Sequence, residues 1–334
     1  MNAMTTAMSG RSWRWPLWVS MVVVAVGLGA LAWRLGLRSD PGFAEFPMLV
    51  KTDIPTAVAA APNGTVWFTI EFSDAIGVFR NGKIDRIPKG AQNLEPLGLA
   101  ADGAGGAWYS DTQMRAISQI SPEGVIHSFP LPTPIVRLGR LGVASDGAVW
   151  FADIVTASVT RLKDGVFIRH DVGSFGATPY GIAVDTGDAV WTTLQGADRL
   201  GYISANGEVS AQDVPTRNSG LGDIVVDQRG AVWFLELRAN KIGRLAEGRF
   251  VEFEVPTPSA GLIALAAAPD GAVWFTELSA GRLGRVRDGR LAEFRLPRPE
   301  SRPFGVAVDA ANNVWYTDLS GWLGMLPASA AKAP

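Results

Sequence analysis

The chain contains no cysteine and only two histidines among its 334 residues. The absence of cysteine excludes disulfide bonds, a thiol nucleophile and any thiolate-ligated metal centre. Two histidines are too few for a multi-histidine metal site. Basic residues are not in excess either, because 30 Lys and Arg stand against 32 Asp and Glu. The chain therefore lacks the positive charge that binding to a phosphate backbone requires, and we expect no nucleic-acid partner.

One stretch near the N-terminus lacks charge altogether. Residues 15–33 read WPLWVSMVVVAVGLGALAW and contain no Asp, Glu, Lys or Arg. At about 1.5 Å per residue, a helix of this length nearly crosses a bilayer core of about 30 Å. The sequence therefore predicts a transmembrane signal anchor over 15–33, with a cytoplasmic tail over 1–14 and a linker over 34–42. The small residues Ala30 and Ala32 leave open a cleaved signal peptide.

This arrangement predicts where the protein resides. We expect a single-pass protein of the inner (cytoplasmic) membrane, held there through the N-terminal helix, with the rest of the chain in the periplasm or outside the cell. Cleavage of the segment would instead give a secreted protein. We expect a monomer in either case.

Seven tryptophans recur along the rest of the chain at intervals of 41 or 42 residues. They are Trp67, Trp108, Trp150, Trp191, Trp233, Trp274 and Trp315. The surrounding residues repeat too, as in DGAVWFAD, RGAVWFLE and DGAVWFTE. A turn-rich period of about 40 residues is typical of propeller blades with four strands each. The sequence therefore predicts an all-β, seven-bladed β-propeller over 43–327, preceded by one transmembrane helix and followed by a short tail over 328–334.

Two-residue turns mark the hairpin between the third and fourth strands of six repeats. They are Asn81-Gly82, Glu123-Gly124, Asp164-Gly165, Asn206-Gly207, Glu247-Gly248 and Asp288-Gly289. Asn-Gly and Asp-Gly favour type I′ turns, in which both central residues have positive φ. We therefore predict tight hairpins at these six places.

The seventh repeat lacks this turn and its fourth strand. The missing strand is found at the other end of the chain, where FAEFPM (43–48) resembles FVEFEV (250–255) and LAEFRL (291–296). All three segments begin 24 residues before a repeat tryptophan. We predict that residues 43–48 form the outermost strand of the last blade and close the ring.

Carboxylates follow the tryptophan by three or four residues in six of the seven repeats. They are Glu71, Asp111, Asp153, Glu236, Glu277 and Asp318. The end of the second strand shares one face of a propeller with the start of the first, so we expect these side chains at one mouth of the axial channel. Oxygen ligands suit Mg²⁺ or Ca²⁺, and we predict Glu71 as a catalytic base and the other five as metal ligands. Alternatively, each carboxylate accepts hydrogen bonds from the N–H groups of the next loop.

Residues that break the repeat at the same mouth are further candidates. Arg140 and Tyr180 are candidate catalytic residues, and Asp223 and Phe304 are candidate ligand-binding residues. Alternatively, Arg140 forms a salt bridge with a neighbouring carboxylate, and the two aromatic residues form an apolar plug. His127 and His170 fall on predicted outermost strands, so we expect no histidine-based acid–base pair at the axis.

The repeated DGAVWFTE followed by IGR or LGR resembles the virginiamycin B lyase (streptogramin lyase) family over residues 43–327. The segments PYGIAVD and PFGVAVD are also similar to NHL repeats. The resemblance implies a seven-bladed propeller that opens a cyclic depsipeptide lactone by elimination, with Mg²⁺ and a general-base histidine. The family's Glu-Pro-His-Gly box at the start of the last blade corresponds here to Arg302-Pro303-Phe304-Gly305, so Phe304 occupies the position of the base.

Three functions are open on this sequence. The first is a membrane-anchored, lyase-like enzyme that uses a divalent cation at the acidic mouth to act on a lactone or a related small molecule. The second is a non-catalytic propeller that binds a small molecule or a peptide. The third is a gluconolactonase-like lactone hydrolase. The missing histidine favours the second function, and the resemblance favours the first. We therefore expect a membrane-anchored, virginiamycin B lyase-like propeller, with the other two functions as alternatives.

Overall fold

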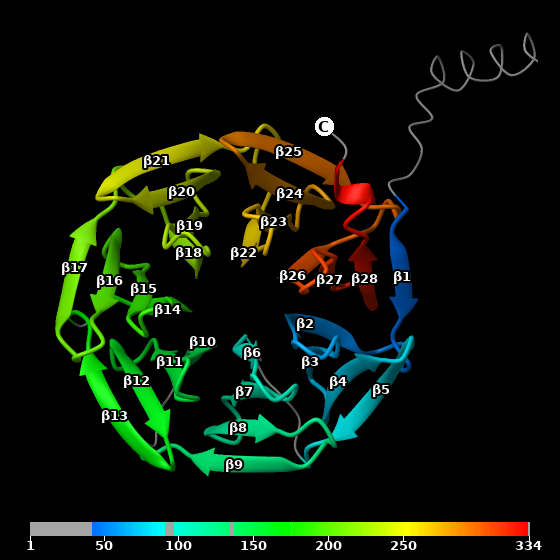
Figure 1. Ribbon diagram of the computed structural model, residues 1–334, viewed down its shortest axis with the longest axis horizontal. Coiled ribbons are helices and arrows are strands. Elements are labelled where there is room, and N and C mark those ends of the chain that lie inside the picture. The colour runs from blue at the N-terminus through cyan, green and yellow to red at the C-terminus, as the bar shows by residue number, and fades with distance from the viewer. Residues whose placement is uncertain (1–41, 91–96, 134–136, 175, 333–334) are drawn as a thin grey trace, which may run out of the picture. The chain divides into compact units, whose positions relative to one another are not determined.

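The computed structural model describes residues 42–90, 97–133, 137–174 and 176–332. Within these ranges the chain forms seven separate four-stranded antiparallel sheets, arranged as blades around one axis (Figure 1). The only other element among the described residues is a 3₁₀ helix, η1 (Ala330–Lys332). The predicted all-β, seven-bladed propeller is confirmed. The predicted membrane segment over 15–33 lies outside the described residues, and none of the described helices has the length and apolarity to span a bilayer.

Each blade has its strands in sequence order from the axis outward. The innermost strands are β2 (Ile54–Ala60), β6 (Leu99–Ala101), β10 (Leu138–Val143), β14 (Pro179–Val184), β18 (Leu221–Val226), β22 (Leu262–Ala267) and β26 (Pro303–Val308). The second strands carry the repeat tryptophans and are β3 (Val66–Glu71), β7 (Ala107–Asp111), β11 (Val149–Asp153), β15 (Val190–Leu194), β19 (Val232–Glu236), β23 (Val273–Glu277) and β27 (Val314–Asp318). We number the blades 1 to 7 in this order.

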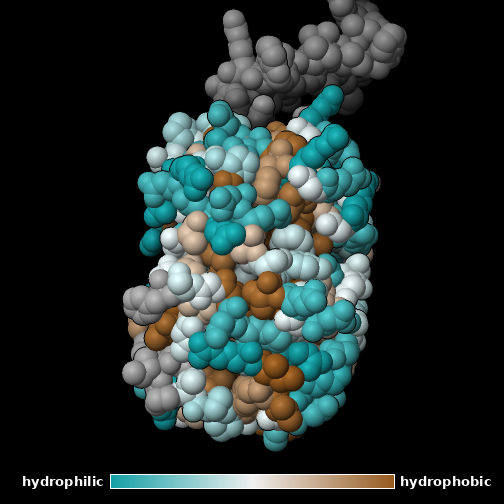
Figure 2. All heavy atoms as spheres, turned by 90° about the vertical axis from the view of Figure 1, so that its left-hand side faces the viewer, coloured by the Kyte–Doolittle hydropathy of each residue, from teal (hydrophilic) through white to brown (hydrophobic). Residues whose placement is uncertain are grey.

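The outer half of each blade is a hairpin. The third strands are β4 (Ala75–Arg80), β8 (Ala116–Ile120), β12 (Ser158–Lys163), β16 (Arg199–Ile203), β20 (Lys241–Ala246), β24 (Arg282–Arg287) and β28 (Trp322–Leu326). The outermost strands of blades 1 to 6 are β5 (Lys83–Pro88), β9 (Ile126–Pro130), β13 (Val166–Asp171), β17 (Val209–Asp213), β21 (Arg249–Glu254) and β25 (Arg290–Arg295). The outer wall around β17 mixes polar side chains with scattered apolar ones (Figure 2), as expected for half-exposed strands.

The ring is closed by the N-terminal strand, as predicted. Strand β1 (Ala44–Pro47) pairs antiparallel with β28, so that Glu45 lies opposite Gly324. The Phe46 ring lies 4.6 Å from the Phe79 ring of blade 1 and 6.4 Å from the Trp315 ring of blade 7. The first strand of the chain therefore joins the last blade to the first.

The repeated WF and IG motifs are explained by packing. Each repeat tryptophan belongs to a core cluster that includes side chains of the following blade; Trp233, for example, packs with Leu265 and Val273 of blade 6. In blades 1, 5, 6 and 7 the aromatic residue after the tryptophan lies under a glycine of the third strand. A Cβ atom at Gly243 would lie only 2.2 Å from the Phe234 ring, so no larger residue fits there. The motif thus encodes one close contact within each of these four blades.

Four of the six predicted type I′ hairpins are confirmed. Both central residues have positive φ at 81–82, 164–165, 247–248 and 288–289. The prediction was wrong at Glu123-Gly124 and Asn206-Gly207, where only the glycine has positive φ. These two hairpins are wider; in the first, Ser121 N–H bonds to Val125 C=O and the Ser121 hydroxyl accepts the Val125 N–H.

Candidate functional site

A bulge at the start of the innermost strands shapes one end of the axial channel. In β14, Pro179 pairs with Leu194 and Ile182 pairs with Thr192, so two residues between them leave the ladder. The same shift occurs in six of the seven innermost strands. A bulge leaves backbone N–H groups without a ladder partner, and such groups need another acceptor when they are buried.

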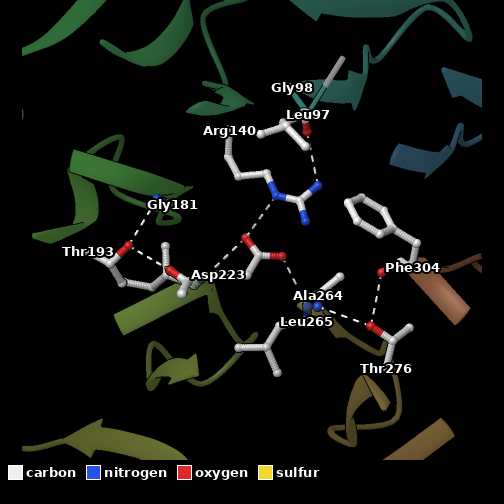
Figure 3. A network of polar contacts seen from close by, with 12 residues as sticks. Leu97, Gly98, Arg140, Gly181, Thr193, Asp223, Ala264, Leu265, Thr276 and Phe304 are labelled. Carbon is white, nitrogen blue, oxygen red and sulfur yellow. Dashed lines mark hydrogen bonds and ion pairs between the residues drawn. The ribbon is translucent and has the colours of Figure 1, made fainter. Parts of the chain in front are cut away.

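In five blades a hydroxyl side chain supplies that acceptor. It is the second residue after the repeat tryptophan: Thr69, Ser110, Thr193, Thr276 or Thr317. Thr193 accepts the Gly181 N–H at 2.9 Å and donates to the Gly222 C=O of the next blade at 2.7 Å (Figure 3). We call these five residues the hydroxyl belt, because their hydrogen bonds follow the ring around the axis.

Two blades lack the belt hydroxyl, and the same two carry a charged residue at the bulge. Blade 3 has Ala152 in the belt position and Arg140 at the bulge, and blade 5 has Leu235 and Asp223. The other blades have Gly or Ala at the bulge. A Cβ atom at Gly181 would lie 2.8 Å from Ile224 Cγ2 and 3.0 Å from the Thr193 hydroxyl, so a side chain larger than that of Ala has little room beside the belt. A charged residue can therefore stand at the bulge where the hydroxyl is absent.

Arg140 and Asp223 meet across the axis (Figure 3). Arg140 Nε lies 3.6 Å from Asp223 Oδ1, and Arg140 Nη1 donates to the Leu97 C=O at 3.0 Å. Asp223 accepts hydrogen bonds from the N–H groups of Ile224, in its own blade, and Leu265, in the next blade. Like a belt hydroxyl, it thus connects two neighbouring blades. Burial by itself lowers the pKa of Arg140, but Asp223 and Tyr180 beside it raise this pKa overall, so the guanidinium stays charged.

The structure thus places Arg140, Asp223 and Phe304 close together around the axis (Figure 3), and Tyr180 interacts with Arg140. We call these four residues the axial mouth. The salt bridge that the sequence left open for Arg140 is present.

The predicted metal ligands do not gather at this mouth. Three of them accept hydrogen bonds from N–H groups of the loop that follows their strand, as the alternative interpretation expected. Asp111 bonds to the Met114 N–H and to Lys89 Nζ at 2.8 Å, and Asp153 accepts from the Val155 N–H and the Thr156 hydroxyl. Asp318 bonds to Arg298 Nη2 at 2.9 Å and to the Ser320 N–H.

The remaining two predicted ligands, Glu236 and Glu277, are fully buried at the ends of β19 and β23. Among the described residues, no three His, Asp or Glu side chains come together as a metal-binding group. The five residues therefore do not fit a shared Mg²⁺ or Ca²⁺ site, and we derive no chemistry through a cation. The physical reason is that side chains along a strand point to the two faces of the blade, which look toward neighbouring blades and not toward the axis.

Glu71 is displaced by one residue from the other carboxylates. Ile70 occupies the buried position in blade 1, since Pro55 pairs with Ile70 where Leu138 pairs with Asp153 in blade 3. Glu71 is instead half-buried at the end of β3 and lines a pocket. Spacing counted from the tryptophan could have revealed this, because Glu71 is four residues after Trp67 and the others are three.

Glu236 and Glu277 are buried without hydrogen bonds to either carboxylate oxygen. Each faces a second carboxylate, Glu252 or Glu293, which takes the nearby cation: Lys241 Nζ lies 2.9 Å from Glu252, and Arg282 pairs with Glu293. Burial, and then the charge of Glu252, raises the pKa of Glu236 to about 7. Burial, and then Glu293, raises the pKa of Glu277 to about 8. Near neutral pH, Glu277 is therefore mostly protonated and Glu236 is about half protonated.

Comparison with known proteins agrees with this fold. The model of the virginiamycin B lyase family matches residues 34–165 and 138–326. The chain belongs to the virginiamycin B lyase family. A virginiamycin B lyase from Nocardia farcinica is 31% identical over 192 residues, which are 57% of this chain and 66% of that protein. The match thus spans slightly less than two thirds of the relative.

Solved structures of the family superpose on most of the chain. A streptogramin B lyase structure has a TM-score of 0.80 with 25% identity and covers 85% of this chain and 96% of its own. A catalytically inactive histidine variant of virginiamycin B lyase from Staphylococcus aureus, crystallised with quinupristin, has a TM-score of 0.79 with 24% identity, over 85% of this chain and 98% of its own.

Within this virginiamycin B lyase fold, the two histidines lie where the sequence predicted. His127 is on β9, with its ring 4.7 Å from the Phe129 ring, and His170 is on β13, with its ring 5.3 Å from the Trp150 ring. Both strands are outermost, and the structure holds no histidine at the axial mouth among the described residues. Phe304 stands at the start of β26, where the resemblance implied the general base.

The buried carboxylates make stability depend on pH. The ordinary pKa of Glu is 4.5, so as the pH rises above that value the unfolded chain releases protons that folded Glu236 and Glu277 retain, up to pH about 7 and about 8. The free energy of unfolding therefore falls over this range. We expect Glu236→Gln to raise it by roughly 3 kcal/mol and Glu277→Gln by roughly 4 kcal/mol at pH 8, and both by little at pH 4.

Urea denaturation at the two pH values measures this difference. Glu208→Gln, at an exposed position on the hairpin before β17, is the matched control and should change stability equally little at both. Equal effects of Glu236→Gln at pH 4 and pH 8 would contradict the protonated state.

Proposed function

We propose that this member of the virginiamycin B lyase family is a ligand-binding propeller that does not carry out histidine-based elimination. The observation that supports the proposal most is the composition of the axial mouth: an Arg140–Asp223 ion pair beside Phe304, with both histidines on outermost strands. A general base must come within about 3 Å of the proton it removes. Neither His127 nor His170 meets that condition for a ligand bound at the mouth.

The ligand that we propose is a small molecule or a peptide. Arg140 Nη2 has no hydrogen-bond partner although it is buried, which leaves a charged donor for a carbonyl or carboxylate oxygen. Tyr180 and Phe304 add aromatic surface. The YCF48 propeller, which shares the fold at 13% identity and a TM-score of 0.69, was solved bound to the D1 peptide. The architecture is thus compatible with peptide recognition.

A lyase remains the second candidate. Glu71 favours it, because its half-buried carboxylate opens into a pocket of about 390 Å³ and could act as a base on a lactone or related small molecule. A metal-dependent lyase or a gluconolactonase-like hydrolase would need a set of oxygen ligands for Mg²⁺ or Ca²⁺. The described carboxylates are dispersed, so the lyase that the geometry supports is one without a resident cation.

Turnover of virginiamycin B in the presence of Mg²⁺ decides between the two candidates. We expect no linear product above the buffer control, while an active virginiamycin B lyase serves as positive control. Turnover that survives loss of both histidines but disappears in Glu71→Gln would establish the second candidate instead. Turnover that requires His127 or His170 would contradict both.

We also propose that the propeller is a monomer anchored to the inner membrane and displayed outside the cytoplasm. The uncharged run over 15–33 supports the anchor. Closure of the ring within one chain leaves no blade that needs a partner. Ala44 pairs with Met325, so the chain enters β1 at the end of the blade opposite the axial mouth.

Reporter fusions after Pro334 test the topology. A reporter active only outside the cytoplasm should be active on the full chain and inactive on a matched fusion that lacks residues 1–40. Activity of a cytoplasm-only reporter on the full chain would contradict the proposal.

A further inference from the structure

Asp223 bridges two innermost strands whose partner strands end in the same way. It accepts hydrogen bonds from the N–H groups of Ile224 on β18 and Leu265 on β22 (Figure 3). Strand β18 pairs with β19, which ends in Glu236, and β22 pairs with β23, which ends in Glu277. Both strands that hold the carboxylate of the axial mouth are therefore paired with a strand that ends in a fully buried glutamate.

Blade 7 shows how the same position is neutralised elsewhere in the ring. There Arg298 contacts two carboxylates, Asp318 at the end of β27 at 2.9 Å and Glu45 of the outermost strand at 3.0 Å. Arg298 lies 17 residues before the repeat tryptophan, and the residues at that position in blades 5 and 6 are Thr216 and Thr257. These two blades therefore lack the guanidinium that joins the two carboxylates in blade 7.

In blade 5 the nearby cation pairs with the outer carboxylate. Lys241 Nζ lies 2.9 Å from Glu252, to which the Thr216 hydroxyl also donates at 2.9 Å. Glu254 is a further negative charge near Lys241. Glu236 is left beside the Glu252 carboxylate, and neither of its own oxygens has a hydrogen bond. An ionised Glu236 would thus be a second negative charge in a buried place, which is unfavourable.

Blade 6 repeats this arrangement. Arg282 pairs with Glu293 of the outermost strand, and the Thr257 hydroxyl donates to the same carboxylate at 2.9 Å. Glu277 faces Glu293 and has no hydrogen bond to either oxygen. The same unfavourable charge therefore arises when Glu277 ionises.

The end of β19 is in contact with the backbone that carries Asp223. Glu236 lies opposite Leu221, and the residue after it, Leu237, lies against Gly222. A Cβ atom at Gly222 would be only 2.8 Å from the Leu237 side chain. Gly222 directly precedes Asp223 in the bulge. Movement of the end of β19 toward water would therefore displace Asp223.

We propose that the ends of β19 and β23 form a pH-sensitive switch that regulates the axial mouth. With both glutamates protonated, the strand ends stay paired and hold Asp223 beside Arg140. When a glutamate ionises, its strand end opens to water and the mouth loosens. The effect on a bound ligand rests on the proposed function of the mouth, whereas the opening itself does not.

The direction of the switch follows from its two states. An opened strand end exposes its glutamate, whose ordinary pKa is 4.5, whereas burial and then the second carboxylate raise the pKa of closed Glu236 to about 7 and that of closed Glu277 to about 8. Between these values opening releases a proton, so a higher pH favours the open state. Mildly acidic pH therefore keeps the mouth closed, and neutral to mildly alkaline pH loosens it.

Hydrogen exchange of the full chain from pH 5 to pH 8, measured by mass spectrometry and corrected for the intrinsic exchange rate, tests the switch without a ligand. Protection of residues 219–226 should fall by roughly thirtyfold from pH 5 to pH 7, since one released proton changes the equilibrium by up to about tenfold per pH unit. Residues 260–267 should lose protection up to pH 8. Residues 301–308 of blade 7, where Arg298 joins the two carboxylates, are the internal control and should change little.

Two results would overturn the proposal. An equal loss of protection in 301–308 would mean that the chain opens only as a whole. Unchanged protection of 219–226 would mean that the end of β19 does not open. Because no ligand is added, neither result bears on whether the mouth binds one, and a failed binding test would leave the exchange result intact.

Variants of nearly the same shape assign the switch to the two glutamates. Glu236→Gln should give 219–226 the same protection at pH 5 and pH 7, and Glu277→Gln should do so for 260–267, because an amide has no proton to release. Glu254→Gln, at an exposed position of blade 5, is the matched control and should leave both pH dependences unchanged. A pH dependence of 219–226 that persists in Glu236→Gln would contradict the proposal.

Discussion

The bulge at the start of each innermost strand is the constraint on which the axial mouth depends. It frees a backbone N–H group in a buried place, and that group needs an acceptor. Five blades meet the need with a Ser or Thr hydroxyl, which in blades 4, 6 and 7 also bonds to the next blade. Blade 5 has no such hydroxyl, and there the Asp223 carboxylate accepts the N–H of the next residue, Ile224, and that of Leu265 in the next blade. The Asp223 carboxylate is thus an acceptor in a blade without a belt hydroxyl, whereas Arg140 in blade 3 can only donate and supplies none.

This alternative connects the fold to the function. Because a belt hydroxyl leaves little room for a long side chain at the bulge position of Gly181, a blade carries either the hydroxyl or a charged side chain at that position. Blades 3 and 5 lack the hydroxyl, and they carry Arg140 and Asp223 at the axial mouth. A virginiamycin B lyase scaffold can therefore change the chemistry of its mouth by paired substitutions, without a change in the ring.

Much of the fold could be predicted from the sequence because the repeat is a packing unit. The tryptophan spacing and the copy of FVEFEV at 43–48 were sufficient for seven blades and for closure through β1. The directions of the carboxylates could not be predicted in the same way. The third residue after each tryptophan points between blades, where Asp318 meets Arg298 but Glu236 and Glu277 meet no cation of their own. That difference depends on residues of the outermost strands and connecting loops, far away in sequence.

The most direct test of the bulge interpretation is a double-mutant cycle on Asp223→Gly and Leu235→Thr, measured as the free energy of unfolding of the full chain in urea. Together these substitutions give blade 5 the pair found in blade 4, Gly181 and Thr193. If a hydroxyl and a bulge carboxylate are alternatives, the double variant should be more stable than the sum of the single effects predicts, by roughly 1–3 kcal/mol. Additive effects would contradict the interpretation, because they would mean that a hydroxyl introduced at position 235 cannot take over what Asp223 does.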